Sequence, residues 1–160
     1  MKIELLSEVP NAIDDAVEMI YEEFVIKTKS SATKSTIKKF LTCGQDFPIT
    51  FVAVADEKNV GTISIFENDY KARLQYKPWL ASLVVRENYR KYGIGTKLIK
   101  AVVDKAGELG YPEIYLKTET AAGYYDKLGW QRVERVVGDD GIESWIFKKS
   151  AKKTLQNQKG

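Results

Sequence analysis

Residues 79–110 of this 160-residue chain read WLASLVVRENYRKYGIGTKLIKAVVDKAGELG. The first seven of them, 79–85, form a nearly continuous apolar run, which is typical of a strand buried in the centre of a sheet. From Ile94 onward, apolar residues recur three or four apart, and this spacing predicts a helix from about Thr96 to Gly110. The stretch therefore predicts a central strand that leads through a short turn into a helix.

The turn itself, Arg90-Lys91-Tyr92-Gly93-Ile94-Gly95, is a candidate anion site. The first N–H groups of a helix have no intrahelical acceptor, and the helix dipole adds about half a positive charge there. Gly93 and Gly95 let the backbone come close to a phosphate, and Arg90 and Lys91 add mobile positive charge. The alternative is an ordinary strand–helix turn in which the glycines serve only the backbone geometry.

Two other phosphate-binding motifs do not fit this turn. A Walker A loop needs G-x-x-x-x-G-K-[ST], which is absent from the sequence. A dinucleotide-binding turn needs G-x-G-x-x-G, but Leu98 stands at the third glycine position. The turn therefore matches neither of these motifs.

The rest of the chain predicts further strands and helices in alternation, from hydrophobic periods of two and of three to four residues. Strands are expected at 2–6, 49–55, 60–66, 113–118, 130–137 and 142–149, and helices at 10–26, 30–42 and 120–128. Ser30 or Ser31 is expected to cap the second helix. We therefore expect one α/β (α+β) domain over residues 1–149, built on a central mixed sheet, and a basic tail over 150–160.

The composition agrees with a globular protein, since 44% of the residues are apolar and 29% are charged. No apolar run approaches 18 residues, so we expect no membrane span. The formal net charge of +3 comes from five lysines in the last 13 residues, and the preceding part holds 20 basic and 22 acidic side chains. Nucleic acid is therefore not the expected partner.

The sequence contains no histidine, which excludes Ser-His-Asp and Cys-His catalysis and most zinc sites. We expect no metal, and any general base must be a carboxylate, a lysine, a tyrosine or a water. The single cysteine, Cys43, cannot form an internal disulfide, which agrees with a reducing cytoplasm. We expect Cys43 to be a small buried apolar residue rather than a nucleophile.

The turn and a later segment together resemble the GNAT superfamily of N-acetyltransferases. Arg90, Gly93 and Gly95 occupy the positions of its R/Q-x-x-G-x-G/A turn, and residues 121–130, AAGYYDKLGW, look like its A-x-x-x-Y-x-K-L-G-[FW] segment. The resemblance covers about residues 3–149. It implies a splayed central sheet of about seven strands, flanked by about four helices, and acetyl-coenzyme A as cosubstrate.

The resemblance also implies roles for particular residues. The N–H groups of Lys91, Tyr92, Gly93, Ile94, Gly95 and Thr96 would hold the pyrophosphate of the coenzyme, and the backbone of Leu83, Val84 and Val85 would pair with its pantetheine arm. The Leu83 N–H would stabilise the oxyanion of the reaction. Tyr125 would protonate the departing thiolate, whereas Tyr124 is expected in the core. Thr118 stands where many members have an asparagine that binds the coenzyme.

The acceptor amine must lose a proton before it can attack, and a carboxylate commonly removes it. Glu67, Asp69 and Glu119 follow predicted strands, and Glu67 is the preferred candidate. Aromatic side chains with acidic neighbours are expected to wall an acceptor pocket or to cover the sheet edge: Tyr70, Tyr76, Trp79 and Tyr21, with Glu22 or Glu23.

The sequence therefore favours a cytoplasmic enzyme that acetylates a primary amine of a small molecule, with neither nucleic acid nor membrane as partner. A protein or peptide N-acetyltransferase is the second interpretation. A coenzyme-A-binding module without turnover is the third, and the presence of Tyr125 argues against it. The sequence leaves open whether the chain forms a homodimer.

Overall fold

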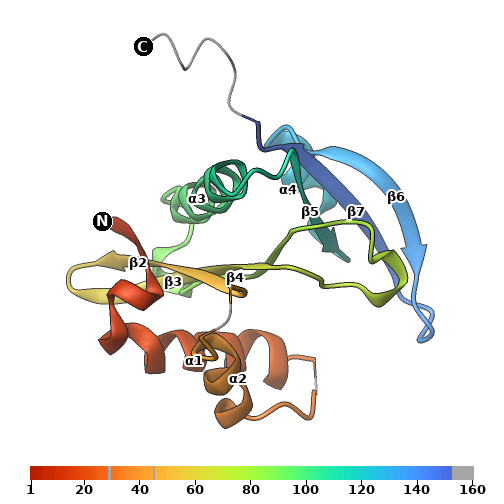
Figure 1. The fold of residues 1–160 in the computed structure, drawn as a ribbon. Coiled ribbons are helices and arrows are strands. Elements are labelled where there is room, and N and C mark those ends of the chain that lie inside the picture. Colours follow the sequence, from red (N-terminus) through yellow and green to blue (C-terminus); the bar gives the residue numbers. More distant parts are fainter. Residues whose placement is uncertain (29, 45, 153–160) are drawn as a thin grey trace, which may run out of the picture. The chain divides into compact units, whose positions relative to one another are not determined.

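The computed structural model describes residues 1–28, 30–44 and 46–152, and it contains one seven-stranded mixed sheet in the order β1-β2-β3-β4-β5-β7-β6 (Figure 1). The strands are β1 (Lys2–Leu5), β2 (Ile49–Ala55), β3 (Lys58–Phe66), β4 (Trp79–Val85), β5 (Glu113–Thr118), β6 (Gln131–Val137) and β7 (Glu143–Ser150). The α-helices of the described residues are α1 (Ile13–Tyr21), α2 (Lys34–Leu41), α3 (Ile94–Glu108) and α4 (Ala122–Lys127). The expected α/β domain with a central mixed sheet is confirmed.

The fold contains two compact units. Unit 1 is Met1–Glu67 with Leu80–Val102, and unit 2 is Asn68–Trp79 with Val103–Gly160. The turn before α3 lies in unit 1, whereas Tyr125 lies in unit 2.

The core of unit 1 is built around β3, whose residues from Asn59 to Ile65 are all buried. Helix α1 packs against β3, and α1 and α2 lie on the same side of β2 and β3 (Figure 1). On Gly61 of β3, an added Cβ would stand 3.1 Å from a methyl group of Leu98. The absence of a side chain at this position thus lets the first turns of α3 pack closely on the strand.

The hairpin between β2 and β3 is tighter than the four-residue turn expected at 56–59. Ala55 pairs with Lys58, so only Asp56 and Glu57 form the turn. Both have left-handed backbone angles, with φ of 51° and 63°, as a two-residue type I′ turn requires. β3 therefore begins at Lys58 instead of residue 60.

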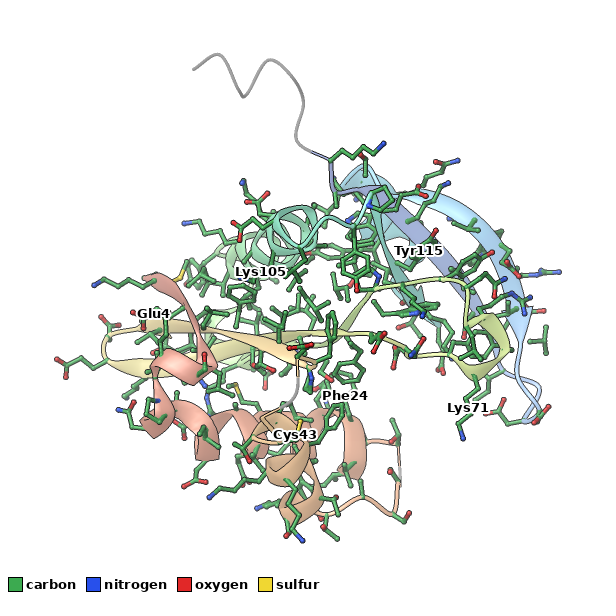
Figure 2. All side chains as sticks on the ribbon, viewed as in Figure 1. Glu4, Phe24, Cys43, Lys71, Lys105 and Tyr115 are labelled. Atoms are coloured by element: carbon green, nitrogen blue, oxygen red, sulfur yellow. The ribbon has the colours of Figure 1, made fainter. Side chains whose placement is uncertain are left out.

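The expected helix over 10–26 is divided into three parts. A 3-10 turn (Pro10–Ala12) precedes α1, and a π-helical turn (Glu22–Ile26) follows it. Because a π turn inserts one extra residue, Val25 takes the buried position that a regular helical period assigns to Phe24, and Phe24 is 38% exposed. Phe24 is labelled in Figure 2.

The second helix, α2, starts later than expected, and its N-cap is Thr33 rather than Ser30 or Ser31. The Thr33 hydroxyl accepts the N–H of Thr36, and the Thr36 hydroxyl accepts the N–H of Thr33, which together form a capping box. Beyond the helix, Cys43 is exposed and not buried as expected. Its Sγ lies 3.7 Å from the carbonyl oxygen of Phe47.

In unit 2, β5, β7 and β6 are antiparallel neighbours. Alternate residues of β5, Ile114 and Leu116, are buried together with Ile146 and Phe147 of β7, and they form the apolar core of this unit. Parallel pairing between β4 and β5 joins Trp79 to Tyr115.

The folded chain continues slightly beyond the boundary expected at 149. β7 ends at Ser150, and Ala151 is buried, with its N–H donating to the carbonyl of Pro112 at 2.9 Å. A Cβ built on Gly107 of α3 would stand only 2.1 Å from the carbonyl oxygen of Ala151. The helix and the end of the strand thus meet where a side chain has no room. The rest of the expected tail, 153–160, lies outside the described residues.

Two of the five lysines in the last 13 residues, Lys148 and Lys149, lie in β7. Lys148 Nζ lies 3.1 Å from a carboxylate oxygen of Glu113, and Lys149 Nζ donates to the carbonyl of Leu128 at 2.8 Å. They are therefore structural groups of unit 2 rather than solvated tail charges.

Over 1–28, 30–44 and 46–152, no helix is both long and apolar enough to cross a bilayer. The same part of the chain shows no cluster of three or more carboxylate or thiol side chains that could hold a metal ion.

Candidate functional site

The turn before α3 has an unusual backbone. Lys91 and Gly93 both adopt left-handed angles, with φ of 71° and 78°, and α3 starts directly after them at Ile94. Left-handed angles that alternate with right-handed ones turn successive N–H groups toward the same side, and such concave nests bind anions. This angle strains the backbone of Lys91, since a residue with a Cβ rarely adopts it.

The residues of the turn differ in how deeply they are buried. Ile94 is buried and anchors the start of α3 in unit 1, whereas Lys91, Tyr92 and Gly93 are exposed. An added Cβ on Gly93 would meet no atom within 4 Å. The glycine is therefore required for its backbone angle rather than for lack of room.

Arg90 does not provide the mobile charge that the sequence suggested. Its Nε donates to the carbonyl of Val85 at 2.8 Å, and its Nη2 lies 4.0 Å from the Glu23 carboxylate. The guanidinium thereby fastens the turn to the end of β4. Lys91, which is exposed, adds a second positive charge to the turn.

A bulge in β4 changes which residues face the core. Ser82 has a φ of 56°, which is unusual within a strand. After it, Val84 is buried while Leu83 and Val85 are half-buried. No local signal in the sequence indicated this bulge.

Tyr125 is held in unit 2 by the way in which α4 ends. Gly129 has a φ of 83°, its N–H donates to the Asp126 carbonyl, and the Trp130 N–H donates to the Tyr125 carbonyl. This pair of bonds is a Schellman motif, which requires a residue such as glycine in the left-handed region and often an apolar residue after it. The buried Trp130 is that residue. The Lys-Leu-Gly-Trp sequence is thus explained by helix termination.

The phenol of Tyr125 lies among aromatic rings. Its ring centroid is 5.8 Å from that of Trp130 and 5.9 Å from that of Phe147. Burial, and secondarily Tyr124, raise the pKa of Tyr125 to about 12. The hydroxyl has no hydrogen-bond partner within the described part of the chain. Tyr124 was expected in the core, but it is 41% exposed.

A salt bridge beside Tyr125 links α4 to β6. Arg132 donates to both carboxylate oxygens of Asp126, at 3.1 Å from Nε and 2.6 Å from Nη2. Its guanidinium also lies 4.7 Å above the ring of Trp145. The arginine pairing lowers the pKa of Asp126.

Thr118 at the end of β5 has a structural partner. Its hydroxyl oxygen accepts the N–H of Ala121 at 3.0 Å and so supports the approach to α4. The three candidate bases, Glu67, Asp69 and Glu119, are all exposed residues. Although Asp69 is accessible to solvent, the surrounding protein desolvates its carboxyl group and raises its pKa to about 6, against the opposing charge of Lys117.

The aromatic residues expected to wall an acceptor pocket play different parts. Trp79 is fully buried and belongs to the core, and its Nε1 donates to the carbonyl of Tyr76 at 2.7 Å. The ring of Tyr76 is stacked on Tyr115, which Figure 2 labels. Tyr70 is half-buried, and the Lys117 ammonium lies 4.7 Å from its ring centroid.

Residues 14–130 match a family described as the acetyltransferase (GNAT) family. Over 91 residues the chain is 32% identical to N-alpha-acetyltransferase 30 of Schizosaccharomyces pombe, an alignment covering 54% of this chain and 60% of that protein. Over 117 residues it is 31% identical to human N-acetyltransferase 8B, covering 70% and 49%. The chain thus spans roughly half the length of these relatives.

Solved structures resemble the fold along nearly the whole chain. An aminoglycoside 6'-N-acetyltransferase complexed with coenzyme A superposes with a TM-score of 0.77 at 18% identity, covering 96% of this chain and 99% of that one. A ribosomal-protein-alanine N-acetyltransferase from Brucella melitensis has a TM-score of 0.71 at 15% identity, with 94% and 99% covered. At such low identity the likeness concerns the fold alone.

Proposed function

Because the chain belongs to the acetyltransferase (GNAT) family, we propose that it transfers the acetyl group of acetyl-coenzyme A to a primary amine of a small molecule. The observation that carries this proposal is the backbone of the turn before α3. Two left-handed residues, Lys91 and Gly93, precede a helix start, and a backbone of this kind is suited to bind an anion through its N–H groups. The pyrophosphate of a coenzyme is an anion of that kind.

In this proposal the N–H groups of 91–96 hold the pyrophosphate, while the backbone of Leu83, Val84 and Val85 binds the pantetheine arm as an added strand would. Arg90 keeps the turn closed by its bond to Val85. Thr118 is an additional contact to the coenzyme, and its bond to Ala121 leaves its hydroxyl proton free to donate.

The N–H of Leu83 is the proposed donor to the oxyanion that forms when the amine attacks the thioester. One such donor contributes about 2.7–4 kcal/mol to the stability of the transition state. The half-buried position of Leu83, next to the Ser82 bulge, supports this role, because the bulge interrupts the regular strand at that N–H.

Tyr125 is the proposed general acid. With a pKa of about 12, the phenol keeps its proton at neutral pH. Since a thiol has a pKa near 8.5, the phenol is the weaker acid, and we expect it to donate a hydrogen bond to the sulfur as the C–S bond breaks, and then its proton. The absence of a hydrogen-bond partner for the hydroxyl among the described residues leaves it available for the sulfur.

The amine must first become neutral. For an alkylamine with a pKa of about 10.4, deprotonation at pH 7 costs about 4–5 kcal/mol, and a carboxylate that takes the proton lowers this cost. Glu67, which the sequence favoured, stays a prediction, with Asp69 and Glu119 as the alternatives. A cytoplasmic location and a homodimer also stay predictions.

A second candidate function is acetylation of the amino group at a protein N-terminus. The 32% identity to N-alpha-acetyltransferase 30 of Schizosaccharomyces pombe favours it. The likeness over 96% of the chain to an aminoglycoside acetyltransferase structure concerns the fold, which is compatible with a small amine as acceptor. Both functions use the same coenzyme site and differ in the acceptor.

Release of free thiol from acetyl-coenzyme A, measured with polyamines, amino acids, aminoglycosides and short peptides as acceptors, tests the proposal. We expect acceptor-dependent thiol release with at least one small amine. Transfer to peptides alone would establish the second candidate instead. Coenzyme binding by calorimetry without transfer to any acceptor would indicate a binding module and refute both.

A further inference from the structure

Helix α4 (Ala122–Lys127), which carries the proposed general acid, has only six residues. A helix of this length is not stable alone in water, so its contacts with the rest of unit 2 determine where it lies. Before the helix, the Thr118 hydroxyl accepts the N–H of Ala121. After the helix, the Lys149 ammonium donates to the carbonyl of Leu128. Both bonds are made to residues that flank α4.

An ion pair reaches a side chain inside the helix. Asp126 accepts two hydrogen bonds from Arg132 of β6, at 3.1 Å from Nε and at 2.6 Å from Nη2. A guanidinium that binds a carboxylate through two bonds fixes its direction as well as its distance. Because Asp126 directly follows Tyr125 in the chain, this pair holds α4 at the residue next to the phenol.

Arg132 also covers a ring against which Tyr125 packs. Its guanidinium lies 4.7 Å from the ring centroid of Trp145 and 5.8 Å from that of Phe147. The Phe147 ring centroid lies 5.9 Å from that of Tyr125. Arg132 is therefore connected to the phenol in two ways, through Asp126 of the helix and through the Phe147 ring of β7.

A bulge in β6 separates Arg132 from its near neighbour Glu134. In a regular strand two residues this far apart share a face of the sheet. Here they pair with consecutive residues of β7, and since paired residues share a face, Arg132 and Glu134 lie on opposite faces. Glu134 accordingly accepts hydrogen bonds from Arg73 and Tyr76 of the loop before β4. The bulge thus leaves Arg132 on the face that α4 covers.

The pair of Arg132 and Asp126 is too exposed to matter much for stability. Their side chains are 41% and 42% exposed, and ion pairs at such positions contribute little to the free energy of unfolding. What two bonds and a ring contact do determine is the direction in which a short helix lies. A variant that lacks the pair should therefore stay folded, with α4 less well fixed.

We propose that Arg132 is a positioning residue for Tyr125, and that its bonds to Asp126 hold the phenol where it can protonate the leaving sulfur. The inference rests on the proposed acetyltransferase function. In that reaction the amine nitrogen attacks the thioester carbon, a C–N bond forms, and the C–S bond breaks with its electron pair going to sulfur. The sulfur takes the proton of Tyr125, and the proton that the nitrogen releases restores the phenol.

The first experiment is a double-mutant cycle in the full chain that combines Arg132→Met with Tyr125→Phe. Acetyl transfer is measured with spermidine, kanamycin and a short peptide as acceptors. We expect Arg132→Met to lower kcat about ten-fold or more, with the KM for the amine and the Kd for acetyl-coenzyme A unchanged. In the Tyr125→Phe background the same change should leave kcat unaltered, because the group that Arg132 positions is absent.

The cycle separates the inference from the function on which it rests. An equal fall of kcat in both backgrounds would show that Arg132 does not act through Tyr125, and would overturn the inference. Absence of transfer by the wild type to any of the three acceptors would instead refute the proposed function.

Arg135→Met is the matched control, because Arg135 lies in the same strand and forms an exposed ion pair with Glu143. It should leave kcat unchanged, and a fall as large as that of Arg132→Met would contradict a role specific to Arg132. Arg132→Lys keeps the charge but cannot make both bonds to the carboxylate, so it should recover only part of the lost kcat.

A second measurement needs neither coenzyme nor acceptor. The backbone N–H of Leu128 donates to the carbonyl of Tyr124 at the end of α4, and its hydrogen exchange reports how firmly the helix is held. We expect Arg132→Met to speed this exchange about ten-fold and Arg135→Met to leave it at the wild-type rate. Equal exchange in Arg132→Met and the wild type would show that the ion pair does not hold α4.

Discussion

Gly93→Val is the most direct test of the coenzyme turn, because the structure offers a matched control. Gly93 has a φ of 78° and Gly44, which follows α2, has a φ of 74°. At both positions an added Cβ would meet no atom within 4 Å. The two substitutions therefore introduce the same backbone strain without a collision, and they differ only in what the backbone does.

The strain has a predictable size. A residue with a Cβ costs about 1–2 kcal/mol in the left-handed region. For a chain of this length, 1 kcal/mol lowers the melting temperature by about 2–4 °C. We therefore expect Gly93→Val and Gly44→Val to lower it by similar amounts, with both proteins folded at 25 °C.

Coenzyme affinity should separate the two variants. If the turn relieves its strain by leaving the left-handed region, the N–H groups after Gly93 no longer point at the pyrophosphate. Each lost bond to a charged group costs about 1.5–3 kcal/mol, which is a factor of about 10 or more in Kd. Calorimetric titration with acetyl-coenzyme A should show this loss for Gly93→Val and wild-type affinity for Gly44→Val. Equal affinity in both variants would refute the role of the turn.

Three further predictions concern the acid, the packing and the pH. Tyr125→Phe should lower kcat about 100-fold or more with an unchanged coenzyme Kd, and an unaltered kcat would remove Tyr125 from the mechanism. Gly107→Ala should lower the free energy of unfolding in urea titration by about 1–3 kcal/mol, because the added methyl group collides with Ala151. At Gly123 in α4 an added Cβ meets no atom within 4 Å, so Gly123→Ala should leave the stability unchanged or raise it. The bond from Arg73 lowers the pKa of Glu134, so the Arg73–Glu134 ion pair contributes stability above about pH 4.5 that is lost as the pH falls further. The difference in melting temperature between the wild type and Glu134→Gln should therefore shrink below that pH. A constant difference would contradict the ion pair.

Local sequence patterns predicted the helices and strands well where the hydrophobic periodicity was strong and one residue clearly marked the end of the element. The apolar run at 79–85 became β4, and the glycine turn led into α3 as expected. The cap of α2 was wrong because three hydroxyl residues precede it, and only the reciprocal bonds with Thr36 select Thr33. The shift from Phe24 to Val25 depends on a π turn that no residue type signals.

The site was predictable only in its local parts. The turn residues and Tyr125 belong to short contiguous motifs. The hydrogen bonds of Glu134 with Arg73 and Tyr76 join residues about 60 positions apart, and no spacing rule reveals such a contact. The burial that raises the pKa of Asp69 comes from protein brought around it by folding, which no local pattern in the sequence shows.

The contact between Gly107 and Ala151 gives the C-terminal end of β7 a part in holding the helix α3. Exopeptidase trimming that removes Ala151 would expose the backbone of α3 around Gly107 to water. The lifetime of the protein in a cell lysate should therefore fall once digestion passes this single alanine.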